Sequence, residues 1–324
     1  MLTSRKWALS GLLALALVVP ARAAELDRYV PGDTEQVVVV NVKQLLASPL
    51  VKKHALPQIE KQLKENKDLQ KLTQATGIDP LKDIDSLVVA NTGDKGEKVT
   101  VIVRGKFDTD KIHTIAQAVA KDKPDELKIS KLGDRPLYEG THDGKSFYST
   151  FVDGTTLVGS TSKDVLASAI QGKGAKNKEL TAALENLDSK QSVLAAGVVP
   201  QEVRDFLGNL PQGPAEALSK LKTVAGSVHI TGGVAAGVRL STGNEKAAKE
   251  LAEAGDMVKG LLAAAAAVNK ELLPLAEDLQ RTLNIKPSQG DVTIDFKVSE
   301  KTVDKLIKAA PRGGRKTPPP KQDQ

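Results

Sequence analysis

Apolar and polar positions along the chain follow two patterns, one typical of strands and one typical of helices. Residues 86–91 and 99–104 are apolar, β-branched runs separated by a glycine-rich segment, which predicts two strands joined by a turn. Asp108 then stands at a helix N-cap position, and apolar residues recur at helical spacing from Ile112 to Val119. The same order of strand and capped helix returns three more times along the chain. The fold is therefore predicted to repeat this unit.

The strongest strand signal lies before this unit, at residues 36–42, which read QVVVVNV. A strand that is apolar on both faces is typical of the centre of a sheet, so we expect a central position. Residues 43–53 predict a helix with a break at Pro49, and residues 57–76 predict an amphipathic helix.

A meander of strands follows in the first half of the chain. Asp-Gly pairs at 143–144 and 153–154 predict tight hairpin turns. The strands are predicted at residues 127–132, 135–140 (or 137–141 in the hairpin), 146–152 and 155–159. A helix over residues 163–171 ends this part of the chain.

The second half repeats the order of elements of the first. Residues 189–207 parallel 34–51, residues 223–254 parallel 84–118, and residues 288–310 parallel the end of the meander. An alanine-rich stretch at 245–284 predicts a helical hairpin, interrupted near Gly255, Gly260 and Pro274. We therefore predict an α+β fold of two similar halves, residues 24–175 and 176–310, each an antiparallel sheet with helices packed on one face. Internal duplication and convergent patterning both explain this similarity.

Both ends of the chain differ from the body. Residues 1–23 combine Arg5 and Lys6, an apolar run at 7–19 and a small-residue cleavage site at 21–23, which predicts a cleaved signal peptide. The alternative is a membrane anchor, but that run has 13 residues and a spanning helix needs about 20. We therefore expect an exported, periplasmic or extracellular protein that is not membrane-spanning once processed. Residues 311–324 are basic and proline-rich, and predict a disordered tail.

Charge and composition narrow the function classes. The formal charge is +6, but residues 1–23 and 311–324 each carry +3, so the body between them is neutral. A neutral body gives no field that attracts nucleic acid, and the tail alone is expected to contact anionic surfaces weakly. The chain has no cysteine, which excludes disulfides, thiolate metal sites and a cysteine nucleophile.

Two motifs resemble catalytic or phosphate-binding sequences. Ser160 and Lys163 fit the S-x-x-K pattern of serine acyl enzymes, but the other elements of that class are missing, and the hydroxyls also suit a helix cap. The segment from Gly140 to Ser146 resembles a phosphate loop, but it has the wrong spacing and precedes a strand. We interpret it as a hairpin turn.

Metal-ligand types are also present. Asp79, Asp83 and Asp85 cluster without the spacing of a calcium loop, and Lys82 lies among them, so we interpret them as turn residues. The four histidines lie in four different predicted elements: His54, His113, His142 and His229. We therefore predict no catalytic, cofactor-binding or metal-binding residues and no cofactor.

Several phrases of the sequence resemble uncharacterised secreted α+β proteins of planctomycete bacteria. They are ASPLVKK at 47–53, GIDPLKDID at 77–85 and VIVRGKFD at 101–108. The resemblance covers most of residues 30–170 and the second half more weakly. It implies export and no established activity, cofactor or catalytic residue.

These observations predict an exported, non-enzymatic binding or structural protein of the periplasm or cell surface, with an unidentified envelope partner or ligand. One alternative is a carrier for an apolar ligand, because small residues dominate 193–199 and 263–268 and can leave a cavity between sheet and helices. The same residues also fit close helix–sheet packing, which is commoner because protein interiors are dense. The other alternative is a cryptic hydrolase that uses a carboxylate pair or Ser160 and Lys163.

Overall fold

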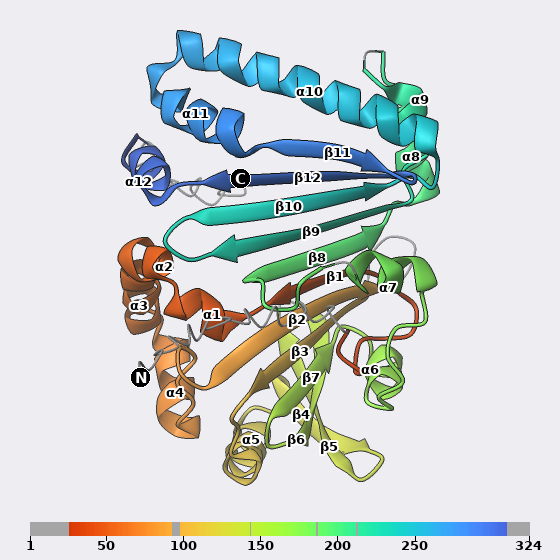
Figure 1. The fold of residues 1–324 in the computed structure, drawn as a ribbon. Coiled ribbons are helices and arrows are strands. Elements are labelled where there is room, and N and C mark those ends of the chain that lie inside the picture. The colour runs from red at the N-terminus through yellow and green to blue at the C-terminus, as the bar shows by residue number, and fades with distance from the viewer. Residues whose placement is uncertain (1–25, 93–97, 143, 186, 212, 310–324) are drawn as a thin grey trace, which may run out of the picture.

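The computed structural model describes residues 26–92, 98–142, 144–185, 187–211 and 213–309. Within them, helices surround one antiparallel sheet of twelve strands, ordered β11-β12-β10-β9-β8-β1-β2-β3-β7-β6-β5-β4 (Figure 1). The predicted α+β class is confirmed. The strands are β1 (Thr34–Val40), β2 (Ile84–Thr92), β3 (Lys98–Gly105), β4 (Leu127–Leu132), β5 (Arg135–His142), β6 (Lys145–Asp153), β7 (Thr156–Ser160), β8 (Val193–Val198), β9 (Thr223–Ile230), β10 (Val234–Ser241), β11 (Asn284–Ser288) and β12 (Asp291–Val298).

The two halves do not form separate sheets. The first strand of each half, β1 and β8, pair antiparallel at the middle of the sheet, with Val38 opposite Ala195. The prediction that residues 36–42 form a central strand is therefore confirmed. The sequence did not predict that the halves share one sheet, because strand pairing between distant segments has no local signal.

The strand order is symmetric about this join. Moving outward, β1, β2, β3, β7 and β6 correspond to β8, β9, β10, β12 and β11. The register corresponds as well: the pair Val89–Val101 and the pair Gly226–Val238 are separated by the same 137 positions (226 − 89 and 238 − 101). The predicted parallel between the halves therefore holds for topology, and its origin by duplication stays a prediction.

The main hydrophobic core lies on one face of the sheet. There, α6 (Lys163–Ala169) and α7 (Lys178–Glu185) bury Leu166, Leu180 and Leu184 against strand residues that include Val37 and Ala225. A smaller core joins α9 (Ala215–Leu218) and α10 (Glu245–Val268) to Leu240 and Val292.

The two cores lie on opposite faces of the sheet. Leu240 pairs with Val224, the neighbour of Ala225, and successive strand residues point to opposite faces. α5 (Thr109–Asp122) packs on the same face as α10. His113 of α5 contacts Tyr138, and Tyr138 lies in one cross-strand row with Val101, through β6 and β7. That row continues to Val238, which is on the same face as Leu240. We expected the helices on one face, and the register shows them on both.

Two predicted helices differ from the sequence prediction, and α7 and α9 were not predicted. The predicted helix at 57–76 is divided at Asn66, whose side-chain oxygen accepts from Leu69 N and starts a new helix. The predicted hairpin at 245–284 turns near residue 269, and α10 continues through Gly255 and Gly260. Gly255 has a packing reason, because a Cβ there would lie 2.8 Å from Ile285 Cδ1 of β11.

The remaining helices are α1 (Val42–Ala47), α2 (Pro49–His54), α3 (Leu56–Glu65), α4 (Lys67–Thr76), α8 (Gln201–Gly208), η1 (Lys270–Leu272), α11 (Leu273–Thr282) and α12 (Glu300–Ala309). The predicted break at Pro49 and the predicted cap at Asp108 are confirmed. In the part of the chain that the structure describes, no helix combines the length and the apolar character needed to cross a bilayer. The predicted signal peptide, the 93–97 turn and the basic tail lie outside the described residues.

Candidate functional site: an apolar groove on the central strands

The helices leave the middle of one sheet face uncovered. Val37 of β1 is 1% exposed on the core face, whereas its neighbour Val38 is 38% exposed on the other face. The same contrast holds on β9, where Ala225 is 1% exposed and Val224 is 36% exposed. The apolar residues on one face of β1 therefore pack in the core, whereas those on the other face are exposed to solvent.

The uncovered face carries a continuous row of apolar positions across six strands. Cross-strand partners in register link Val101, Val89, Val38, Ala195, Gly226 and Val238. Leu240, two residues beyond Val238 on β10, packs into the α9–α10 core, so this core borders the row on one side. At the other end of the sheet, α5 covers the same face (Figure 1).

The second half of this row lines a groove of about 470 Å³, which we call the central groove. Small residues on adjacent strands make it hollow, since Ala195, Gly197 and Gly226 leave space between flanking valines. Among the described residues that line it, Gln36 alone has a polar side chain. The lining consists of Gln36, Val37, Val38, Ala195, Ala196, Gly197, Val198, Val199, Pro200, Val203, Val224, Ala225, Gly226 and Val238. Of these, Val37, Ala196, Val198 and Ala225 have their side chains on the opposite face of the sheet.

One wall of the central groove comes from the segment that follows β8. Pro200 is the N-cap residue of α8, and Val203 of α8 is 43% exposed at the groove. Phe206, one turn further along α8, is 68% exposed. Exposed large apolar side chains next to an apolar recess are typical of binding surfaces.

The sequence motif at Ser160 is buried. Ser160 is 0% exposed, donates a hydrogen bond to Val99 O at 3.0 Å and accepts one from Ser162 N at 3.2 Å. Lys163 begins α6 on the exposed surface. The hydroxyl therefore ties β7 to β3 and the start of α6, and in this structure no substrate can reach it.

The aspartate cluster has the turn geometry expected from the sequence. Asp83 Oδ2 accepts from Asp79 N at 2.7 Å, and Asp79 Oδ1 accepts from Leu81 N at 3.0 Å. The Lys82 ammonium at 2.8 Å lowers the pKa of Asp79. Asp85 points elsewhere and pairs with Lys43 at 2.6 Å.

The histidines also stay apart. His54 Nε2 lies 2.6 Å from Asp304 Oδ1 of α12, and His113 Nδ1 lies 3.0 Å from Tyr138 Oη. His229 lies on β9, and the side chain of His142 is outside the described part. The described residues contain no group of three or more His, Asp or Glu that could hold a metal ion. Gly140 and Thr141 belong to β5 and pair with Phe147 and Ser146 of β6, and Gly144 has a φ of +71°, so the described residues of this segment belong to a β-hairpin.

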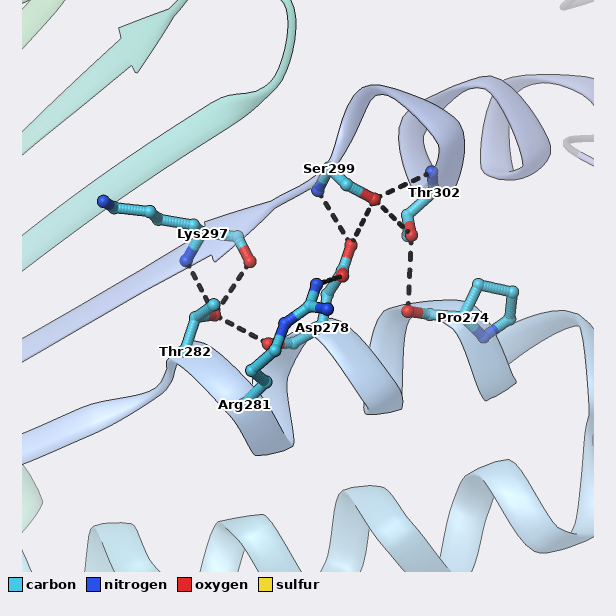
Figure 2. A network of polar contacts seen from close by, with 7 residues as sticks. All are labelled: Pro274, Asp278, Arg281, Thr282, Lys297, Ser299 and Thr302. Atoms are coloured by element: carbon cyan, nitrogen blue, oxygen red, sulfur yellow. Dashed lines mark hydrogen bonds and ion pairs between the residues drawn. The ribbon is translucent and has the colours of Figure 1, made fainter.

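A buried polar network holds α11 and the start of α12 together (Figure 2). Asp278 of α11 is 5% exposed, and its Oδ2 accepts from Ser299 N at 2.8 Å and Ser299 Oγ at 2.7 Å. Its Oδ1 lies 2.6 Å from an Arg281 nitrogen. Burial raises the pKa of Asp278, but hydrogen bonds from Ser299 and Thr302, together with the Arg281 charge, outweigh burial and lower it. The carboxylate therefore holds both the cap of α12 and the guanidinium of Arg281.

Comparisons with known proteins add little. No protein-family model and no curated protein matches this sequence. A crystal structure titled "Structure of crystal form III of TP0453" superposes with a TM-score of 0.44 at 11% identity, over 88% of this chain and 98% of that chain. A likeness of this degree supports no inference about function. The resemblance to secreted planctomycete proteins stays a prediction.

The residues of the central groove were only partly visible in the sequence. Small residues at 193–199 and 263–268 suggested a cavity between sheet and helices. β8 does line the groove, but the groove lies on the part of the sheet that the helices leave uncovered, and residues 263–268 are not in its lining. The role of Val38 was missed, because its apolar character also fits a strand buried on both faces. The contributions of Val224 and Gly226 depend on register between distant strands, for which a single sequence has no signal.

Proposed function

We propose that this protein is an exported, non-enzymatic binding protein of the periplasm or cell surface that holds an apolar ligand in the central groove. The observation that carries the proposal is the exposure of Val38 and Val224 in the middle of the sheet, where their neighbours on the other face, Val37 and Ala225, are buried. A soluble domain gains stability by covering such a surface. A ligand that covers this surface removes the same apolar area from water, and this favours its binding.

The chemistry of the lining favours an uncharged or largely apolar ligand. Gln36 offers one polar contact, and the described lining contains no ionisable side chain. A volume of about 470 Å³ lies within the range of small-molecule sites, about 300–1,000 Å³. Export rests on the signal-like sequence at residues 1–23.

The proposal is tested with the uncharged fluorescent probe N-phenyl-1-naphthylamine. We expect saturable binding to the purified protein. Val38→Ser removes about 1 kcal/mol of apolar contact and should weaken binding about five-fold. Ala195→Leu should weaken it more by filling the groove.

Val119→Ser is the matched control. Val119 is 37% exposed on α5, almost the same as Val38, but it lies outside the groove. Its substitution should leave binding unchanged. Equal loss in both variants, or no saturable binding by the unaltered protein, would contradict the proposal. Export is tested separately, by fractionating cells that express the full chain and sequencing the N-terminus for a start at Ala24.

A further inference from the structure

A second recess, of about 470 Å³, lies on the core face of the sheet's second half, where β9, β10 and β12 end beside α11. Its floor is a cross-strand row, in which His229 pairs with Ala235 and Ala235 pairs with Lys297. This row is on the face of Ala225, opposite to the central groove. The small side chain of Ala235 leaves the space between His229 and Lys297 open, across two strand spacings of about 4.8 Å each.

A third basic residue reaches the recess from α11. Arg281 lines it, and the buried carboxylate of Asp278 holds one guanidinium nitrogen at 2.6 Å (Figure 2). The side chain of Arg281 is 72% exposed, so its other nitrogens face solvent. A guanidinium fixed in this way offers the remaining donors in a set geometry, which suits the oxygens of a phosphate or carboxylate.

The two acidic residues that line the recess are already engaged. Both oxygens of Asp278 accept from Ser299 and Arg281, and Glu300 Oε1 lies 3.1 Å from Lys53 Nζ. Lys297 uses its backbone groups to bind Thr282, and the ammonium of Lys297 has no ion-pair partner among the described residues. The donors without partners at this recess are therefore basic.

His229 lies at the floor of the recess. Its Nδ1 is buried and has no hydrogen-bond partner in the described part of the chain. Buried ring nitrogens are normally paired, because an unpaired one costs stability. Because this nitrogen is closed to solvent, the His229 ring serves as a reporter at the floor of the recess and Nδ1 is not assigned a contact to the ligand.

We propose that the recess between His229, Arg281 and Lys297 binds a small oxyanion, as a phosphate or carboxylate group. Arg281 and Lys297 supply the charge, and the ring of His229 lies at the floor. This site is separate from the central groove, since the two lie on opposite faces of the sheet.

The test is a titration of the purified protein with sodium phosphate, followed by NMR of the His229 ring. We expect a saturable shift, about five-fold weaker in Lys297→Gln and in Arg281→Gln. A parallel titration with sodium acetate distinguishes a carboxylate from a phosphate, and sodium chloride at equal ionic strength measures non-specific screening.

Lys286→Gln is the matched control, because Lys286 is an exposed lysine of β11 outside the recess. It should bind phosphate like the unaltered protein. Thermal melts confirm that each variant is folded. The proposal is overturned if neither anion shifts the ring beyond the chloride control, or if Lys297→Gln and Lys286→Gln bind equally.

Discussion

Val38 of β1 lies directly opposite Ala195 of β8, and this pair joins the two halves of the protein into one sheet. The pair also lies in the middle of the uncovered apolar face, with both residues lining the central groove. The strand pair that unites the halves therefore supplies the floor of the candidate binding site.

Asp278 is predicted to be a main determinant of stability in the second half. Asp278→Asn keeps a similar shape but loses the ion pair with Arg281 and a charge-assisted bond to Ser299, so it should cost about 2 kcal/mol of unfolding free energy. Urea unfolding at pH 7 measures this cost. Asp122→Asn, at the exposed end of α5, should cost almost nothing.

The same carboxylate predicts a dependence on pH. Because the folded pKa of Asp278 is lowered from 3.8, its contribution is complete above about pH 4 and is lost as the pH falls through the folded pKa. Between pH 5 and pH 2, the free energy of unfolding should fall less steeply for Asp278→Asn than for the unaltered protein. Parallel curves would show that the carboxylate is not stabilised in the folded state.

Two glycines should respond to alanine in opposite directions. A Cβ at Gly105 would lie 2.3 Å from the Asp83 carbonyl oxygen, so Gly105→Ala should destabilise the protein by about 2 kcal/mol. Gly260 is helical with nothing within 4 Å of the added Cβ, so Gly260→Ala should stabilise it by about 0.5–1 kcal/mol. Thermal denaturation of both variants checks the packing at β3 and the continuity of α10.

Ser160→Ala distinguishes structural from catalytic use of this hydroxyl. Loss of the bonds to Val99 O and Ser162 N should cost about 1 kcal/mol of stability. Any rate of ester hydrolysis measured for the purified protein should be the same in Ser160→Ala and in Lys163→Ala. Turnover that disappears in both variants while they stay folded would revive the hydrolase hypothesis.

The sequence predicted local structure better than long-range structure, for physical reasons. The cap at Asp108, the break at Pro49 and the Asp153-Gly154 turn depend on residues close in sequence, and all were predictable. The pairing of Val38 with Ala195 brings together residues 157 positions apart (195 − 38). No local pattern encodes such a contact.

The sequence analysis predicted neither the helix α7 nor the continuity of α10, for related reasons. The helix α7 has eight residues, and its role appears only when Leu180 and Leu184 are placed on the sheet. Gly255 suggested a break because glycine weakens helices. Its close approach to Ile285 shows that packing outweighs this preference.

The most direct test of the central claim is a set of intermolecular NOEs between bound N-phenyl-1-naphthylamine and the methyl groups of the labelled protein. The proposed function predicts NOEs to Val38, Ala195 and Val224 in the central groove, and none to Val37, which is their buried neighbour on the other face. NOEs confined to methyl groups outside the groove, with Val38 and Ala195 silent under saturating probe, would contradict the account.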